Sequence, residues 1–91
     1  MDIPAGWTGI DAAIQRTFRT GNFARGVSLV VAIGKLADEA DHHPDILLTY
    51  PAVVVTLTTH DEGRVTERDL RLAAQIDRLW AERFAAPGGT G

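Results

Sequence analysis

The chain has 91 residues, a formal net charge of −3 and no cysteine. This length predicts one compact domain with a modest core, and the lack of cysteine excludes disulfides, thiolate metal sites and a cysteine nucleophile. The mild acidity argues against a nucleic-acid or membrane-surface binder, and the residue pattern predicts neither a membrane-spanning helix nor a secretory signal. We therefore expect a cytoplasmic protein with one domain, residues 1–86, and a flexible tail, residues 87–91.

A short strand and a long helix are predicted in the first half of the chain. Residues 13–18 alternate in polarity, which is typical of a strand. Asn22 follows as a suitable N-cap residue, and residues 23–40 carry apolar side chains at spacings of three and four, which indicates an amphipathic helix. Gly26 and Gly34 each weaken that helix by up to about 1 kcal/mol relative to alanine, and a helical glycine can allow another element to approach closely.

Two strands joined by a turn are predicted next. Pro44 pushes the residue before it toward extended backbone and ends the helical region. Residues 46–49 are a short strand candidate, and residues 53–59 are the clearest strand because they combine three valines with three threonines. Alternation places Thr59 on the same face as two of the valines and His60 on the opposite face.

A second helix is predicted to begin after Thr66. Thr66 and Asp69 have the spacing of a capping box, in which each side chain accepts a hydrogen bond from the other residue's backbone N–H. An apolar stripe follows at Leu70, Ala73, Ile76, Trp80 and Phe84. The order strand–helix–strand–strand–helix predicts an α+β fold in which the helices cover one face of a small antiparallel β-sheet.

All three histidines of the chain lie between residues 42 and 60. His42 and His43 stand where the first helix gives way to extended chain. If the two later strands form a hairpin, His43 and His60 return to the same edge of the sheet, because strands rise about 3.3 Å per residue. Three interpretations are open: incidental surface residues, a zinc site with one free position, and general acid–base catalysis near neutral pH. The pair of histidines four residues apart that marks many zinc sites is absent from the sequence.

The other polar and aromatic candidates each have an ordinary structural explanation. Asp69 can close the capping box, orient an imidazole, or do both. Trp7 either covers the core or stacks on a flat ligand. Asp38 and Arg68 can also be solvent-exposed helix residues, and Thr58 and Thr59 can be ordinary strand residues.

Together these residues form a pattern of Asp38, three residues, His42-His43-Pro44, five residues, Tyr50, nine residues, His60, eight residues and Asp69. The stretches Thr58-Thr59-His60 and Thr66-Glu67-Arg68-Asp69 belong to the same pattern. It resembles the pterin-4a-carbinolamine dehydratase family, and the resemblance runs from about Gly6-Trp7 to the end of the second helix.

The resemblance implies a reaction, the dehydration of 4a-hydroxytetrahydropterin to quinonoid dihydropterin and water. The substrate forms when an aromatic amino-acid hydroxylase uses tetrahydrobiopterin, so the reaction belongs to cofactor recycling and the hydroxylase is a potential partner. No metal and no organic cofactor are implied. Family members form homodimers or homotetramers, and neither nucleic acid nor a membrane is expected as a partner.

The resemblance also implies roles for particular residues. His42 and His60 are expected to transfer protons, His43 to position the pterin, and Asp69 to orient an imidazole or hold its charged form. The implied substrate-binding residues are Asp38, Pro44, Thr58, Thr59, Arg68 and Trp7.

The chain departs from the family's usual pattern in two places. It begins six residues before Trp7, so the N-terminal helix of longer members is missing or reduced. Val27, Val30 and Val31 stand where relatives often carry bulkier aromatic side chains. This difference affects the surface through which family members assemble into oligomers. Two alternative functions stay open: a non-catalytic binding, coactivator or enzyme-assembly module on the same fold, and a dehydratase of another pterin pathway such as molybdopterin metabolism.

Overall fold

The computed structural model describes residues 2–85, so the predicted tail, residues 87–91, lies outside the described residues. The elements in chain order are β1 (Thr8–Ile10), β2 (Ala13–Arg19), α1 (Phe23–Ala40), β3 (Asp45–Leu48), β4 (Ala52–Leu57) and α2 (Glu67–Arg83). The predicted order strand–helix–strand–strand–helix is confirmed, with one strand added at its beginning.

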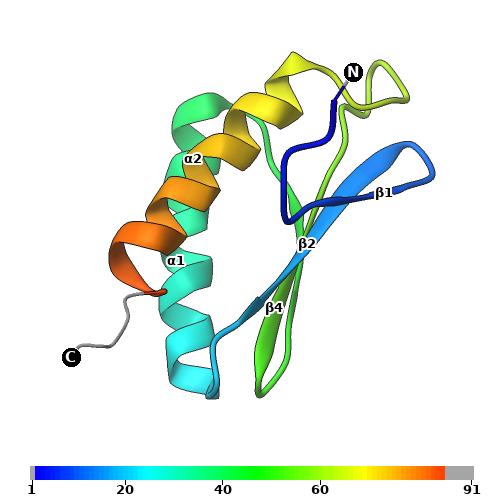
Figure 1. The fold of residues 1–91 in the computed structure, drawn as a ribbon. Helices are drawn as coiled ribbons and strands as arrows, with labels where there is room; N and C mark the ends of the chain where they lie inside the picture. Colours follow the sequence, from blue (N-terminus) through cyan, green and yellow to red (C-terminus); the bar gives the residue numbers. More distant parts are fainter. Residues whose placement is uncertain (1, 86–91) are drawn as a thin grey trace.

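The strands form one antiparallel sheet in the order β1-β2-β4-β3. Figure 1 shows both helices on the same side of this sheet, running in opposite directions, so the predicted α+β arrangement is correct. The C-terminal end of α1 and the N-terminal end of α2 lie at the same end of the molecule. This arrangement brings residues near positions 42 and 69 together.

The strand β1 is the element that the sequence pattern did not predict. Its three residues are all exposed, so no alternation between buried and exposed side chains marks it. It is defined by pairing with β2, in which Thr8 faces Gln15 and Ile10 faces Ala13. Asp11 has a left-handed backbone conformation, with φ of 51°, in the turn between the two strands. Pairing with a neighbour, rather than burial of its own side chains, therefore forms this strand.

The core lies between the helices and the face of the sheet that they cover. The predicted face of β4 is fully buried, because Val53, Val55 and Leu57 each have 0% exposure. These side chains pack with apolar residues of β2 and both helices, namely Ile14, Phe18, Leu29, Ile33, Leu72 and Ile76. Burial of apolar surface of this kind is the main source of folding free energy.

A glycine determines how closely α1 approaches the sheet. A Cβ atom placed on Gly26 would lie 2.6 Å from Leu48 Cδ1 and 3.4 Å from a methyl group of Val53. The expectation that a helical glycine allows close approach is therefore confirmed at Gly26. At Gly34 a Cβ atom would meet nothing within 4 Å, so packing does not require glycine there.

Trp7 belongs to the core, with 6% exposure. Its ring packs edge-on against Phe18 with 6.2 Å between ring centroids, and its Nε1–H donates to the Asp77 carboxylate on α2 at 3.0 Å. Arg16 donates to the same carboxylate at 2.7 Å. Of the two interpretations of Trp7, the structure therefore shows the one in which it covers the core.

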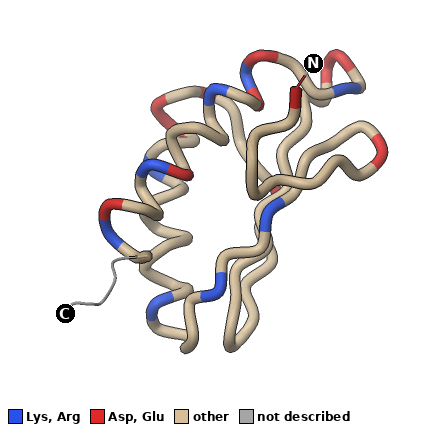
Figure 2. Tube along the Cα trace, viewed as in Figure 1, with Lys and Arg blue, Asp and Glu red and all other residues tan. Residues whose placement is uncertain are grey.

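Charged residues lie mainly on the helices and the loops. Figure 2 shows acidic and basic residues interspersed along α2, whereas most of the strand positions are uncharged. Across residues 2–85, neither helix is long and apolar enough to cross a membrane.

Candidate active site

The end of α1 determines where His42 points. The helix ends in a residue with left-handed backbone, Asp41, with φ of 50° and ψ of 43°. The backbone N–H of His42 then donates to the carbonyl oxygen of Ala37 at 3.1 Å, which satisfies one of the free carbonyls of the last turn. This turn reverses the chain directly before His42, and the His42 side chain is 9% exposed. Pro44 follows in a half-buried position at the start of β3.

The start of α2 determines where Asp69 points. The predicted capping box is confirmed: Thr66 is the N-cap residue, and its backbone N–H donates to Asp69 Oδ2 at 2.9 Å. The Thr66 hydroxyl accepts a hydrogen bond from the backbone N–H of Arg68 at 3.3 Å. Asp69 itself is 0% exposed, which is unusual for a carboxylate and requires hydrogen-bond partners for both of its oxygen atoms.

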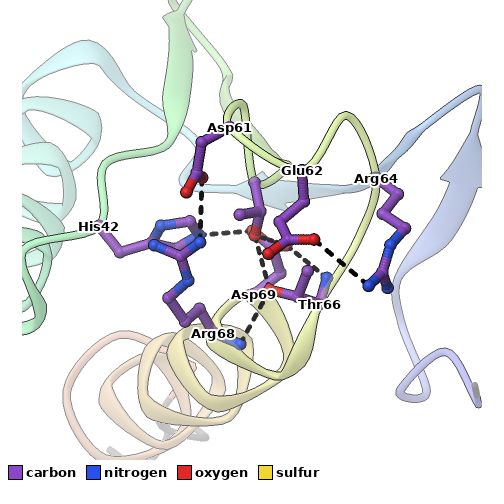
Figure 3. A network of polar contacts seen from close by, with 8 residues as sticks. His42, Asp61, Glu62, Arg64, Thr66, Arg68 and Asp69 are labelled. Carbon is purple, nitrogen blue, oxygen red and sulfur yellow. Dashed lines mark hydrogen bonds and ion pairs between the residues drawn. The ribbon is translucent and has the colours of Figure 1, made fainter.

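These two local structures meet in a buried hydrogen-bond network (Figure 3). The His42 Nε2 atom lies 2.6 Å from Asp69 Oδ1. The Thr59 hydroxyl donates to Asp69 Oδ2 at 2.7 Å and also lies 2.7 Å from the Thr66 hydroxyl. Because a carboxylate only accepts hydrogen bonds, His42 Nε2 carries the proton in this contact. Asp69 therefore both caps α2 and holds the His42 ring, so the two predicted roles coexist.

The second nitrogen of His42 is left available. Every buried side-chain nitrogen and oxygen atom of the described residues has a hydrogen-bond partner. His42 Nδ1 makes no hydrogen bond within residues 2–85, so it reaches the protein surface. His42 is also one of the residues that line a cavity of about 190 Å³, together with Ala40, Arg68, Arg71, Leu72 and Gln75. An imidazole that is fixed through one nitrogen and open at the other is suited to proton transfer.

An ion pair lies beside this imidazole. Arg68 donates to the Asp61 carboxylate at 3.0 Å, and Figure 3 shows both side chains next to His42. The hydrogen bond from Arg68, aided by the positive charges of Arg68 and His42, holds the pKa of Asp61 below its ordinary value. Asp61 was not among the predicted site residues, because a loop carboxylate seven residues before an arginine has no periodic signal.

The other two histidines have different surroundings from His42. The His43 Nε2 atom lies 2.9 Å from Asp38 Oδ1 at the surface. His60 is exposed, in the turn between Thr59 and Arg64. The three histidines are thus near one end of the sheet but are not joined by hydrogen bonds within the described residues. Among residues 2–85, no group of three or more His, Asp or Glu side chains is arranged to hold a metal ion.

The predicted hairpin of β3 and β4 is present, and its register determines which residues before β3 lie opposite which residues after β4. Asp45 of β3 pairs with Thr56 of β4, so continuation of this register brings His43 level with Thr58 and His42 level with Thr59. The Thr58 hydroxyl donates to the backbone oxygen of Ala12 at 2.6 Å and so ties the end of β4 to the β1–β2 turn.

Seven of the ten predicted site residues fall into three groups, and His60, Pro44 and Thr58 lie outside them. His42, Thr59 and Asp69 form one network, and Arg68 lines the cavity beside them. His43 and Asp38 form a separate exposed pair. Trp7 lies in the core and is not among the residues that line this cavity, and its role in substrate binding stays a prediction.

Comparison with known proteins shows the family of the chain. A family model described as pterin 4 alpha carbinolamine dehydratase matches residues 1–79. The chain belongs to this family. A structure described as a transcriptional coactivator/pterin dehydratase from Brucella melitensis is 33% identical, has a TM-score of 0.79 and covers 85% of this chain and 84% of its own.

Curated relatives support the same membership. A protein of Herpetosiphon aurantiacus, provisionally named pterin-4-alpha-carbinolamine dehydratase, is 42% identical over 77 residues, which are 85% of this chain and 80% of the relative. A protein of Sulfolobus acidocaldarius with the same provisional name is 43% identical over 74 residues, 81% of each chain. A pterin dehydratase-like protein identified as a RuBisCO assembly factor in the alpha-carboxysome shares the fold, with 24% identity, a TM-score of 0.65 and coverage of 80% of this chain and 84% of its own.

Proposed function

We propose that this protein dehydrates 4a-hydroxytetrahydropterin to quinonoid dihydropterin and water, as a step in tetrahydrobiopterin recycling. The observation that supports this most directly is the buried contact of 2.6 Å between Asp69 and His42, which fixes an imidazole through one nitrogen in a residue that lines a cavity. Membership of the pterin dehydratase family supplies the substrate class.

The reaction requires two proton transfers and no change of oxidation state. The bond between C4a and the hydroxyl oxygen breaks, and the hydroxyl takes up a proton and leaves as water. The neighbouring ring nitrogen, N5, loses its proton, and a double bond forms between C4a and N5. One group must therefore act as an acid and one as a base, and an imidazole can serve in either role near neutral pH.

His42 has the surroundings that such a group needs. It exchanges a proton with the substrate through Nδ1, while Asp69 holds the ring through Nε2 and stabilises the imidazolium whenever His42 is protonated. Asp69 needs no movement to do this, because Thr59 and the backbone of Thr66 already fix its carboxylate. Preorganised charge of this kind reduces the free energy needed to reach the transition state.

The remaining predicted residues complete the proposal. His60 is the second proton-transfer residue, and His43 positions the pterin with the help of Asp38. Arg68, Pro44 and the chain around Thr58 meet the polar edge and the faces of the pterin ring. An arginine suits the first task because its planar guanidinium presents several donors in a fixed arrangement.

The proposal also includes the oligomeric state of the protein and the source of its substrate. Three apolar side chains on α1 are exposed by about half, namely Phe23 at 49%, Val27 at 41% and Val31 at 55%. Such a stripe suits packing against a second copy of the chain, and a homodimer or homotetramer is the proposed state. An aromatic amino-acid hydroxylase in the cytoplasm is the proposed source of the substrate.

A second candidate function is a non-catalytic binding or coactivator module. The Brucella melitensis relative favours it, because its description names both a transcriptional coactivator and a pterin dehydratase. A stable stoichiometric partner together with a lack of pterin binding would support this function over the dehydratase.

The test is the dehydration rate of 4a-hydroxytetrahydropterin with and without the purified protein. We expect clear acceleration by the wild type and a loss of about 10²-fold or more in kcat for His42→Ala and for His60→Ala. Glu82→Gln, which alters an exposed residue in the last turns of α2, is the control and should keep full activity. No acceleration by the folded wild type, or full activity in both histidine variants, would contradict the proposal.

A further inference from the structure

Asp61 and Arg68 approach the His42 cavity from two different segments. Asp61 lies in the loop between β4 and α2, directly after His60, and Arg68 lies in the first turn of α2, directly before Asp69. Arg68 is one of the residues that line the cavity. Asp61 is not among them, but it accepts a hydrogen bond from the Arg68 guanidinium at 3.0 Å. Figure 3 shows this contact next to the His42 ring.

We propose that Asp61 is a positioning residue for the dehydratase reaction, which holds the Arg68 guanidinium at the mouth of the His42 cavity so that Arg68 can bind the acceptor atoms of the pterin ring. This inference rests on the proposed function and adds a residue that the family pattern of spaced side chains did not single out.

The need for such a residue follows from the nature of an arginine side chain. The backbone of Arg68 is fixed by the cap of α2, since its N–H donates to Thr66. The side chain is long and 45% exposed, so without a partner it would sample many rotamers. The Asp61 carboxylate favours one orientation of the guanidinium before the substrate arrives, by the modest amount typical of an exposed pair. A donor that is partly preorganised loses less entropy when it binds.

Asp61 also balances charge around His42. Arg68 places a positive charge beside an imidazole that must itself become positive when it accepts a proton. The Asp61 carboxylate offsets the guanidinium charge, and the hydrogen bond from Arg68 holds the pKa of Asp61 below its ordinary value. Asp69 contacts His42 directly, and Arg71 lines the same cavity.

The same loop contains a matched control. Glu62 directly follows Asp61 and pairs with Arg64 at 3.4 Å, with both side chains well exposed. Neither Glu62 nor Arg64 lines the His42 cavity. Glu62 and Arg64 do line a neighbouring cavity with Arg68, but neither is hydrogen-bonded to Arg68. Glu62→Gln therefore removes the same charge from the same loop and breaks a similar surface ion pair without removing the Asp61–Arg68 contact.

The experiment compares Asp61→Asn, Asp61→Glu and Glu62→Gln in the full chain. Two quantities are measured: kcat and KM for dehydration, and the Kd of a stable dihydropterin without the 4a-hydroxyl, by fluorescence titration. We expect Asp61→Asn to raise KM and Kd by about two- to fivefold, the range for an exposed ion pair, with kcat changed by less. Asp61→Glu should restore most of the loss, and Glu62→Gln should match the wild type. In an Arg68→Ala background, Asp61→Asn should have no further effect.

The outcomes separate this inference from the proposed function. If the wild type is active and Asp61→Asn behaves as Glu62→Gln does, the positioning role is wrong and the dehydratase function stands. If the wild type is inactive but Asp61→Asn still weakens dihydropterin binding through Arg68, the reaction is wrong and the positioning role stands. A folded wild type that neither binds the dihydropterin nor catalyses the reaction would overturn both. Unfolding midpoints of each variant show that the comparison is made between folded proteins.

Discussion

Two adjacent histidines of this protein, each paired with a carboxylate, have opposite surroundings. His42 and Asp69 are 2.6 Å apart and almost fully buried, whereas His43 and Asp38 are 2.9 Å apart with side chains that are 58% and 81% exposed. The contacts look alike in distance, but water screens the exposed pair and leaves its side chains free to move. Only the buried pair fixes an imidazole in one orientation, and breaking it would leave a buried polar group without a partner.

The backbone explains why neighbouring residues differ so much. Successive side chains of an extended segment point to opposite sides. The left-handed turn at Asp41 aims the first of them, His42, under α2, so His43 must face outward. One backbone conformation therefore decides which histidine is buried.

The largest expected effect comes from removing the buried carboxylate. Asp69→Asn keeps the size of the side chain but loses acceptors for His42, Thr59 and the cap of α2. We expect the free energy of unfolding to fall by about 2–4 kcal/mol, measured by urea denaturation, together with a large loss of kcat. The matched change in the exposed pair, Asp38→Asn, should alter stability by no more than about 0.5 kcal/mol. Equal losses in the two variants would show that burial does not distinguish the pairs.

A smaller effect is expected at the turn that separates the two histidines. Asp41 has φ of 50°, a conformation that glycine adopts freely and a β-branched residue does not. We expect Asp41→Gly to raise the free energy of unfolding by up to about 1 kcal/mol and Asp41→Val to lower it by about 1–2 kcal/mol. Asp41→Val should also reduce kcat, because His42 would be displaced from Asp69. A valine variant as stable and active as the glycine variant would contradict this account of the turn.

The smallest expected effect concerns pH and the ion pair beside the buried histidine. The pKa of Asp61 is lowered in the folded protein, chiefly by the hydrogen bond from Arg68. Its contribution to stability is therefore complete above the unfolded pKa of about 3.9 and is lost as the pH falls through the lower folded value. The unfolding midpoints of wild type and Asp61→Asn should differ slightly at pH 5–7 and converge toward pH 2. A difference between the two unfolding midpoints that grows as the pH falls would contradict this prediction.

Features that depend on neighbours in the sequence were predictable. The alternation of β4 correctly placed Thr59 on the buried face with Val53, Val55 and Leu57. The capping-box spacing of Thr66 and Asp69 gave the start of α2. The apolar stripe of α2 was predicted less well, because Leu72 is more deeply buried than the predicted Leu70. When α2 docks on the sheet and on α1, its buried face is rotated slightly from the face that the spacing of its apolar residues indicates.

Features that depend on contacts between distant segments were harder to predict from the sequence. The strand β1 has three exposed residues and exists because β2 pairs with it. Trp7 fits either the core or a ligand site by residue type, and its place follows from Phe18 and Asp77, which belong to β2 and α2. Asp61 is linked to the site only by its contact with Arg68, which comes from a different segment.

The sequence by itself determined the α+β element order, the histidine and carboxylate chemistry and the family pattern, because local periodicity, capping and residue type are properties of short segments. Only the tertiary structure decided which carboxylate each histidine meets. Asp38 lies close to both histidines along the chain, yet His42 contacts Asp69, which is 27 positions away. The physical reason is that this contact requires the turn at Asp41, the register of β3 on β4 and the docking of α2 at the same time.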